Sequence, residues 1–155
     1  MRTPANIAKH PIHPMLVPIP IGLWIFSLVC DLIYVFGDGS ENWDIAALYS
    51  LIGGILGALV AAVPGIIDML SLHDRPKRIA VMHMSINLTI VALYIVNAWL
   101  RLRGAGGNGP VWLSVIAVAM LGVSGWLGGK MVYEQGVAVD PEAEGVTSHR
   151  HTTQL

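Results

Sequence analysis

Four long apolar segments constrain this chain more than any other feature. They cover approximately residues 15–36, 45–70, 79–100 and 111–133. A helix of about 20 apolar residues crosses the roughly 30 Å hydrocarbon core of a bilayer, at about 1.5 Å per residue. Within hydrocarbon a helix also satisfies its own backbone hydrogen bonds. The sequence therefore predicts an all-α fold, an integral membrane four-helix transmembrane bundle.

Composition supports the lipid bilayer as the main surrounding of the chain. Hydrophobic residues make up 54% of the sequence, charged residues only 12%, and the mean hydropathy is +0.63. A net charge of −1 offers no basic face, so no nucleic-acid partner is expected. Because Cys30 is the single cysteine, a disulfide framework or a cysteine-based metal site is excluded.

The topology predicts three regions and an orientation. We expect an N-terminal segment over 1–14, a helical domain over 15–136 and a flexible tail over 137–155. With four crossings, both termini share one side of the membrane, side A, with the loop around 71–78, and the other loops lie on side B. Seven of the nine Lys and Arg residues fall on side A. The positive-inside rule then predicts a bacterial inner-membrane protein with both termini in the cytoplasm.

Histidines gather toward side A and are the main candidates for function. His10 and His13 precede the first span, His73 follows the second, and His83 lies roughly 10 Å into the third at 1.5 Å per residue. An ionisable side chain at this depth needs a partner, a cavity or a bound group. His83 also begins a polar stripe along the third span, which must face the bundle interior and continues through Asn87, Tyr94 and Asn97.

Prolines and small residues shape the helices around these histidines. Pro14, Pro18 and Pro20 each lack a backbone N–H, so we expect regular helix to begin near Pro20 and 13–19 to form a bent entry. Small residues recur in two spans and favour close packing, or a flat cofactor against backbone; they are Gly53, Gly57, Ala61, Gly65, Gly122, Gly125 and Gly129.

Three interpretations of the histidines remain open. In the first, His13 and His83 are the axial ligands of a b-type haem, with His10 as the alternative to His13 and Asp68 as an orienting group behind a ligand. In the second, a divalent metal ion is bound by a subset of His10, His13, His73 and His83 together with Asp68. In the third, the histidines are structural and no cofactor is bound.

These interpretations lead to two functions. With haem, the chain is a membrane electron-transfer subunit with a separate redox protein as partner. Without it, the chain is a non-redox structural or assembly subunit, or is transporter-like, and its small-residue faces serve a homo-oligomer or a larger complex. No catalytic triad or phosphate loop is present, so we expect a carrier or subunit and assign no catalytic residue. Asp31 is either a proton-pathway carboxylate or a side chain that reaches the outer interface.

Motifs over residues 10–139 resemble one family. The chain is similar to the DUF2231 family of small four-helix membrane proteins of bacteria and archaea. The resemblance implies the four-helix fold. Because some members are joined to a Rieske-type iron–sulfur domain, it also implies electron transfer for those members. This chain ends at Leu155 without such a Cys and His cluster, so we expect any iron–sulfur partner to be a separate protein. The matching segments are His10–Leu23, Pro64–Asp68, His83 and Gly128–Val139.

Overall fold

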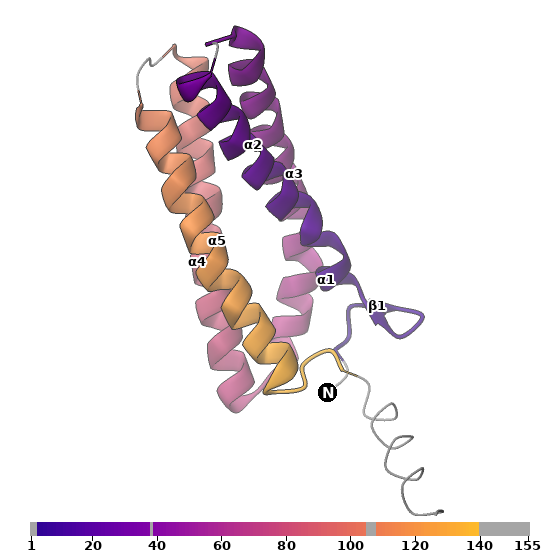
Figure 1. Cartoon of the computed structure of the whole chain (residues 1–155). Coiled ribbons are helices and arrows are strands. Elements are labelled where there is room, and N and C mark those ends of the chain that lie inside the picture. Colours follow the sequence, from indigo (N-terminus) through magenta and orange to yellow (C-terminus); the bar gives the residue numbers. More distant parts are fainter. Residues whose placement is uncertain (1–2, 38, 105–107, 140–155) are drawn as a thin grey trace, which may run out of the picture.

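The computed structural model describes residues 3–37, 39–104 and 108–139 (Figure 1). Within these ranges the helices are α1 (Ile12–Leu16), α2 (Pro18–Phe36), α3 (Glu41–Leu70), α4 (Asp74–Leu102) and α5 (Gly109–Tyr133). The strands β1 (Asn6–Ile7) and β2 (His10–Pro11) form a short antiparallel hairpin.

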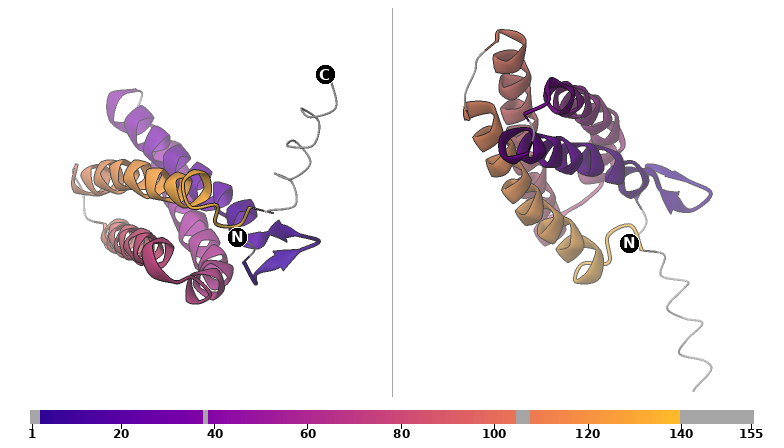
Figure 2. Two further views of the ribbon diagram at one scale, coloured as in Figure 1. Left: turned by 90° about the horizontal axis from the view of Figure 1, so that it is seen from below. Right: turned by 45° about the horizontal axis from the view of Figure 1, so that its top comes forward.

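The long helices run up and down and confirm the predicted all-α bundle. Four of them are long and apolar enough to cross a membrane, counting α1 and α2 as one span over Ile12–Phe36. Each helix packs on the next in sequence, and α2 also packs on α5, which closes the ring. Figure 1 shows side A below, with the α3–α4 turn and the end of α5, and side B above. Figure 2 shows the same helices in two further views, one of them from below.

The entry to the first span differs from the predicted bend. Helix begins at Ile12 and is interrupted only at Val17, whose N–H still donates to the His13 carbonyl at 3.1 Å. Pro14 lies in the first turn of α1, and Pro18 and Pro20 lie in the first turn of α2. N–H groups in a first turn have no partner within the helix, so proline costs little there. The prediction of irregular backbone from 13 to 19 was therefore wrong.

Helices α2 and α3 pack closely because glycines on α3 accept side chains of the first span. A Cβ on Gly54 would collide with the indole Nε1 of Trp24, and one on Gly57 would lie 3.4 Å from the ring of Pro20. At these positions Trp24 Nε1 donates to the Leu51 carbonyl at 3.2 Å. The small-residue row on α3 thus serves close packing, one of its two predicted uses.

The centre of the bundle is an aromatic stack. The rings of Trp24 and Tyr94 lie 4.5 Å apart and within 10° of parallel. Leu51 and Ile90 are fully buried around them. The stack joins the first span to α4 across the bundle interior.

A small cap closes side A. The Ala5 backbone N–H donates to Asp68 Oδ1 at 2.8 Å, which ties the N-terminal segment to the end of α3. Leu72, Ala80 and Val137 form a second apolar cluster at the side A end of the bundle. Val137 belongs to the predicted flexible tail, but it is buried, so the chain remains packed at this position. Residues 140–155 of that tail lie outside the described part.

Replacing Gly54 by Ala tests the packing of the first span on α3. Because the Trp24 ring is held by a hydrogen bond and a stack, we expect the new Cβ to destabilise the protein by about 1–3 kcal/mol, as overpacking does. Thermal unfolding in detergent measures the change. The matched control is Gly122→Ala on α5, where a Cβ meets nothing within 4 Å. Equal melting temperatures for the two variants would contradict the packing described here.

Candidate functional site

His13 and His83 meet between the two halves of the bundle. His13 is the second residue of α1, and His83 lies in the third turn of α4. Their ring centroids are 6.4 Å apart and the ring planes are perpendicular. The convergence predicted from topology is therefore found in the structure, although the residues are 70 positions apart in sequence. Their role as ligands stays a prediction.

Backbone carbonyls fix the tautomer of both imidazoles. His13 Nδ1 lies 2.8 Å from the carbonyl oxygen of Ala61 on α3. His83 Nδ1 lies 3.0 Å from the carbonyl oxygen of Ser124 on α5. Since a carbonyl oxygen only accepts, each Nδ1 must carry the proton and donate. Neutral imidazole then keeps a free lone pair on Nε2, the nitrogen through which histidine binds a metal.

Polar side chains extend the hydrogen bonding on the α4–α5 side. The Asn87 amide donates to Ser124 Oγ at 2.7 Å and to the His83 carbonyl at 2.8 Å. Ser124 Oγ also lies 3.1 Å from His83 Nδ1. His83, Asn87 and Ser124 therefore form one connected group inside the bundle. This group confirms the first half of the polar stripe predicted along the third span.

Glycines leave room beside both rings. A Cβ on Gly65 would lie 2.8 Å from His13 Nδ1, closer than a side chain allows. A Cβ on Gly128 would lie 3.6 Å from His83 Cε1, in ordinary contact. The requirement for glycine is therefore strict at Gly65, because any side chain there would push the His13 ring from the Ala61 carbonyl.

The other predicted site residues lie elsewhere. His10 is exposed in the β1–β2 hairpin, where its Nδ1 donates to the Ala8 carbonyl at 2.9 Å. His73 is exposed just before α4. Asp68, which was predicted to orient a ligating histidine, accepts a hydrogen bond from the backbone N–H of Ala5. Among the described residues, no hydrogen bond joins it to a histidine. In the described ranges no group of three or more His, Cys, Asp or Glu residues could hold a metal ion. The predicted divalent metal set does not form there.

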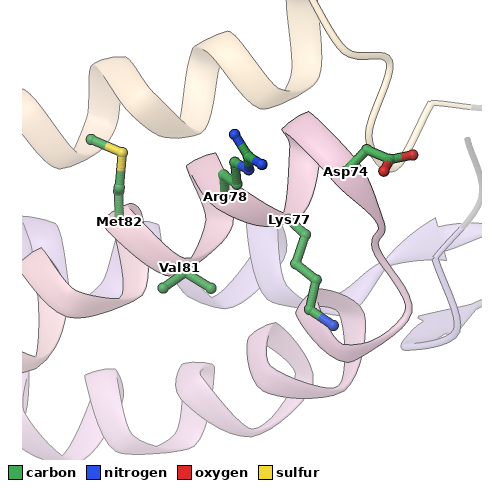
Figure 3. Close-up of a pocket in the computed structure, with 5 residues that line it drawn as sticks. All are labelled: Asp74, Lys77, Arg78, Val81 and Met82. Atoms are coloured by element: carbon green, nitrogen blue, oxygen red, sulfur yellow. The ribbon is translucent and has the colours of Figure 1, made fainter.

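A shallow hollow at the start of α4 contains the cations expected at the rim of side A. It is lined by Asp74, Lys77, Arg78, Val81 and Met82. Figure 3 shows Lys77 and Val81 extending to one side of the helix, and Arg78 and Met82 to the other. All five residues belong to one helix, so the hollow is an outer surface and not the space between the two histidines.

A second polar site, which the sequence did not reveal, lies at side B. Arg101 of α4 donates to both carboxylate oxygens of Asp31 on α2, at 2.7 and 2.8 Å. It also donates to Asp44 on α3 at 2.8 Å. The Arg101 and Asp31 side chains are only 6% and 2% exposed, whereas that of Asp44 is 49% exposed. Placing Asp31 at the outer interface was therefore wrong, because the carboxylate faces the bundle interior.

Asn97 and Ser114 complete this site. Arg101 Nε donates to Asn97 Oδ1 at 2.8 Å, and the Asn97 amide donates to Ser114 Oγ at 2.9 Å. The Ser114 hydroxyl donates to Asp31 at 3.2 Å. We call Asp31, Asp44, Asn97, Arg101 and Ser114 the side B cluster. It draws on α2, α3, α4 and α5, and therefore holds all four spans together at this end.

Fold and sites together define a small polytopic membrane protein with polar groups inside its bundle. A family model described as predicted membrane protein (DUF2231) matches residues 9–141, and the chain belongs to this family. Neither a curated protein nor a solved structure matches the chain. The family supports the four-helix membrane fold and leaves the chemistry to the sites themselves.

Replacing Arg101 by Gln tests the side B cluster. The change leaves Asp31 buried without its cation, and breaking a buried pair in this way costs about 3–5 kcal/mol. Thermal unfolding in detergent measures the loss. Arg103→Gln is the matched control, because Arg103 lies at the helix end with its guanidinium 5.6 Å from the Trp99 ring.

The double variant Asp31→Asn with Arg101→Gln removes the uncompensated charge. We expect it to be more stable than Arg101→Gln alone, since amides at both positions can still hydrogen bond. Equal stability of the single and double variants would show that Asp31 does not depend on Arg101.

Proposed function

We propose that this chain is a membrane electron-transfer subunit that holds a b-type haem between His13 and His83. The observation that carries the proposal is that both histidines have the same tautomer. Each ring donates through Nδ1 to a backbone carbonyl and keeps Nε2 for a metal. Ligating histidines in metalloproteins are commonly oriented in this way. Bis-histidine haem sites are also readily built inside four-helix bundles from facing helices.

The separation of the rings fits a shared metal. An imidazole nitrogen lies about 2.0 Å from a metal that it binds, so two imidazoles that would hold one metal between them have ring centroids roughly 6 Å apart. The observed centroid distance is 6.4 Å. His13 and His83 would hold the iron, and two imidazoles are a donor set that suits haem iron.

The surroundings favour a carrier over an enzyme. A bound haem would supply one-electron transfer, while the protein positions the two imidazoles. The Ala61 and Ser124 carbonyls hold the rings, and Gly65 permits the close approach of His13. The hydrogen bonds around the rings use these carbonyls and amide and hydroxyl groups, and do not pair an acid with a base. We propose that the electron donor or acceptor is a separate redox protein.

The proposed location is a bacterial inner membrane with side A in the cytoplasm. The bias of Lys and Arg toward side A supports this orientation, because positive charges near span ends remain on the cytoplasmic side. A reporter fused after Leu155 tests it in intact cells. We expect a reporter that is active only in the cytoplasm to be active, and one that is active only in the periplasm to be silent. The opposite pattern would reverse the topology.

Visible spectroscopy of the purified protein tests haem binding. After expression with sufficient haem, we expect a Soret band and, on reduction with dithionite, the α band of a b-type haem. His83→Ala and His13→Ala should each abolish or strongly diminish both bands, because each removes one axial ligand. Gly65→Ala should shift or weaken them, since its Cβ displaces the His13 ring.

The exposed histidines provide matched controls for this experiment. His10→Ala and His73→Ala change the same residue type on the same side of the membrane, and their spectra should equal that of the unaltered protein. A colourless protein after haem-replete expression would refute the proposal. It would favour the alternative of a non-redox subunit, in which the two histidines only join helices.

A further inference from the structure

The hollow at the start of α4 contains two cations, Lys77 and Arg78, and both are exposed. In the part of the chain that the structure describes, no acidic side chain lies within ion-pair distance of either one. Lys130, by contrast, is paired with Glu134 at 3.7 Å. Asp74 also lines the hollow. With two positive charges and one negative charge, its lining carries a net charge of +1.

Each cation is followed by an apolar residue one helical turn further along α4. Val81 follows Lys77 and Met82 follows Arg78, in each case by four residues, a rise of about 6 Å. Val81 is 40% exposed and Met82 is 56% exposed. Figure 3 shows each pair on its own side of the helix. The hollow therefore lies between two rows of side chains, and both rows pass from charged to apolar.

This change from charged to apolar follows the boundary of the membrane. Helix α4 begins at Asp74 on side A and is long and apolar enough to cross the bilayer from this end. The cations are therefore at the level of lipid headgroups, and the apolar side chains are where hydrocarbon begins. The exposed face continues with Ser85 and Thr89, whose hydroxyls donate to the carbonyls of Val81 and Ser85 at 2.9 and 3.0 Å. Both hydroxyls are thus satisfied, and these short side chains leave room for an acyl chain.

We propose that this hollow binds an anionic phospholipid. Its phosphate contacts Lys77 and Arg78, and its single negative charge balances the net charge of the hollow. Its acyl chains pass over the exposed face that begins at Val81 and Met82. Cations at a membrane surface attract anionic lipids, and basic pockets at the ends of spans bind lipid headgroups. The proposal does not depend on haem binding, because the hollow is on the outer surface of the bundle.

The lining of the hollow favours one kind of headgroup. The ammonium group of phosphatidylcholine would lie beside two cations and be repelled by them. The hydroxyl groups of phosphatidylglycerol can instead donate to Asp74, because a carboxylate accepts hydrogen bonds. A soluble acidic protein would also meet the cations, but it would leave Val81 and Met82 uncovered. A lipid satisfies the charged and the apolar part of the hollow together.

Native mass spectrometry of the purified full-length protein tests the proposal. The protein in neutral detergent is titrated with dioleoylphosphatidylglycerol or with dioleoylphosphatidylcholine, and the bound fraction gives a Kd for each lipid. We expect phosphatidylglycerol to bind more tightly. Each cation near an anionic membrane surface improves affinity about fivefold, so Arg78→Gln should raise the Kd by about this factor. The double variant Lys77→Gln with Arg78→Gln should raise it about thirtyfold.

Arg75→Gln is the matched control for Arg78→Gln. Arg75 is exposed in the same turn of α4 and loses the same charge, but it lies outside the hollow. Its Kd for phosphatidylglycerol should equal that of the unaltered protein. Excess inorganic phosphate should not displace the lipid, because it makes no contact with Val81 and Met82. All variants should unfold at the same temperature without added lipid, since the changed side chains are exposed.

Three results would overturn the proposal. One is equal affinity for the two lipids. Another is an equal loss of affinity in Arg75→Gln and Arg78→Gln, which would show general attraction by surface charge. The third is displacement of the lipid by inorganic phosphate, which would show a site for a soluble anion. If Arg78→Gln does not fold, Lys77→Gln must raise the Kd in its place.

Discussion

The need to satisfy every polar group without water governs this bundle. Indole, imidazole, amide and hydroxyl donors bond to backbone carbonyls of a neighbouring helix, which use their second lone pair to accept. Trp24 bonds to Leu51, His13 to Ala61, and His83 to Ser124. These bonds set the spacing and rotation of the helices, and the glycines of α3 are required because donor side chains must reach its backbone.

The hydrogen bonds also divide the two polar sites by chemistry. At side A, two imidazoles donate to carbonyls and retain a lone pair that is suited to a metal. At side B, the Arg101 guanidinium donates to Asn97, Asp44 and Asp31. The two carboxylates there offset its positive charge. The side A arrangement leaves the Nε2 atom of each imidazole available to a metal. In the side B cluster the polar groups bond to one another. The metal binding that we propose therefore belongs to side A.

Much of this structure could be predicted from the sequence, for identifiable reasons. Apolar length predicts the spans, and counting crossings brings His13 and His83 to the same side, where they meet. The helical start at Ile12 was missed because Pro14, Pro18 and Pro20 were taken as breakers, although they occupy first turns. The Asp31–Arg101 pair was missed because Arg101 near a span end resembles an interfacial anchor. Arg101 follows Asn97 by four residues and so continues the polar stripe predicted to face the interior, and this spacing is the signal that could have placed it there.

The pattern of contacts has a consequence for assembly. Bonds from side chains to backbone carbonyls lie within α1–α3 or within α4–α5, as with His13 to Ala61 and Asn97 to Pro110. The contacts between these two halves are of other kinds and include the paired imidazole rings, the Trp24–Tyr94 stack, the Arg101 ion pairs and the hydrogen bond from the Ser114 hydroxyl to Asp31. Each helical hairpin can therefore insert and set its own geometry first. The pair of histidines at side A and the side B cluster each need residues from both halves. They therefore form only when α4–α5 packs on α1–α3, and detecting either one shows that the bundle is fully folded.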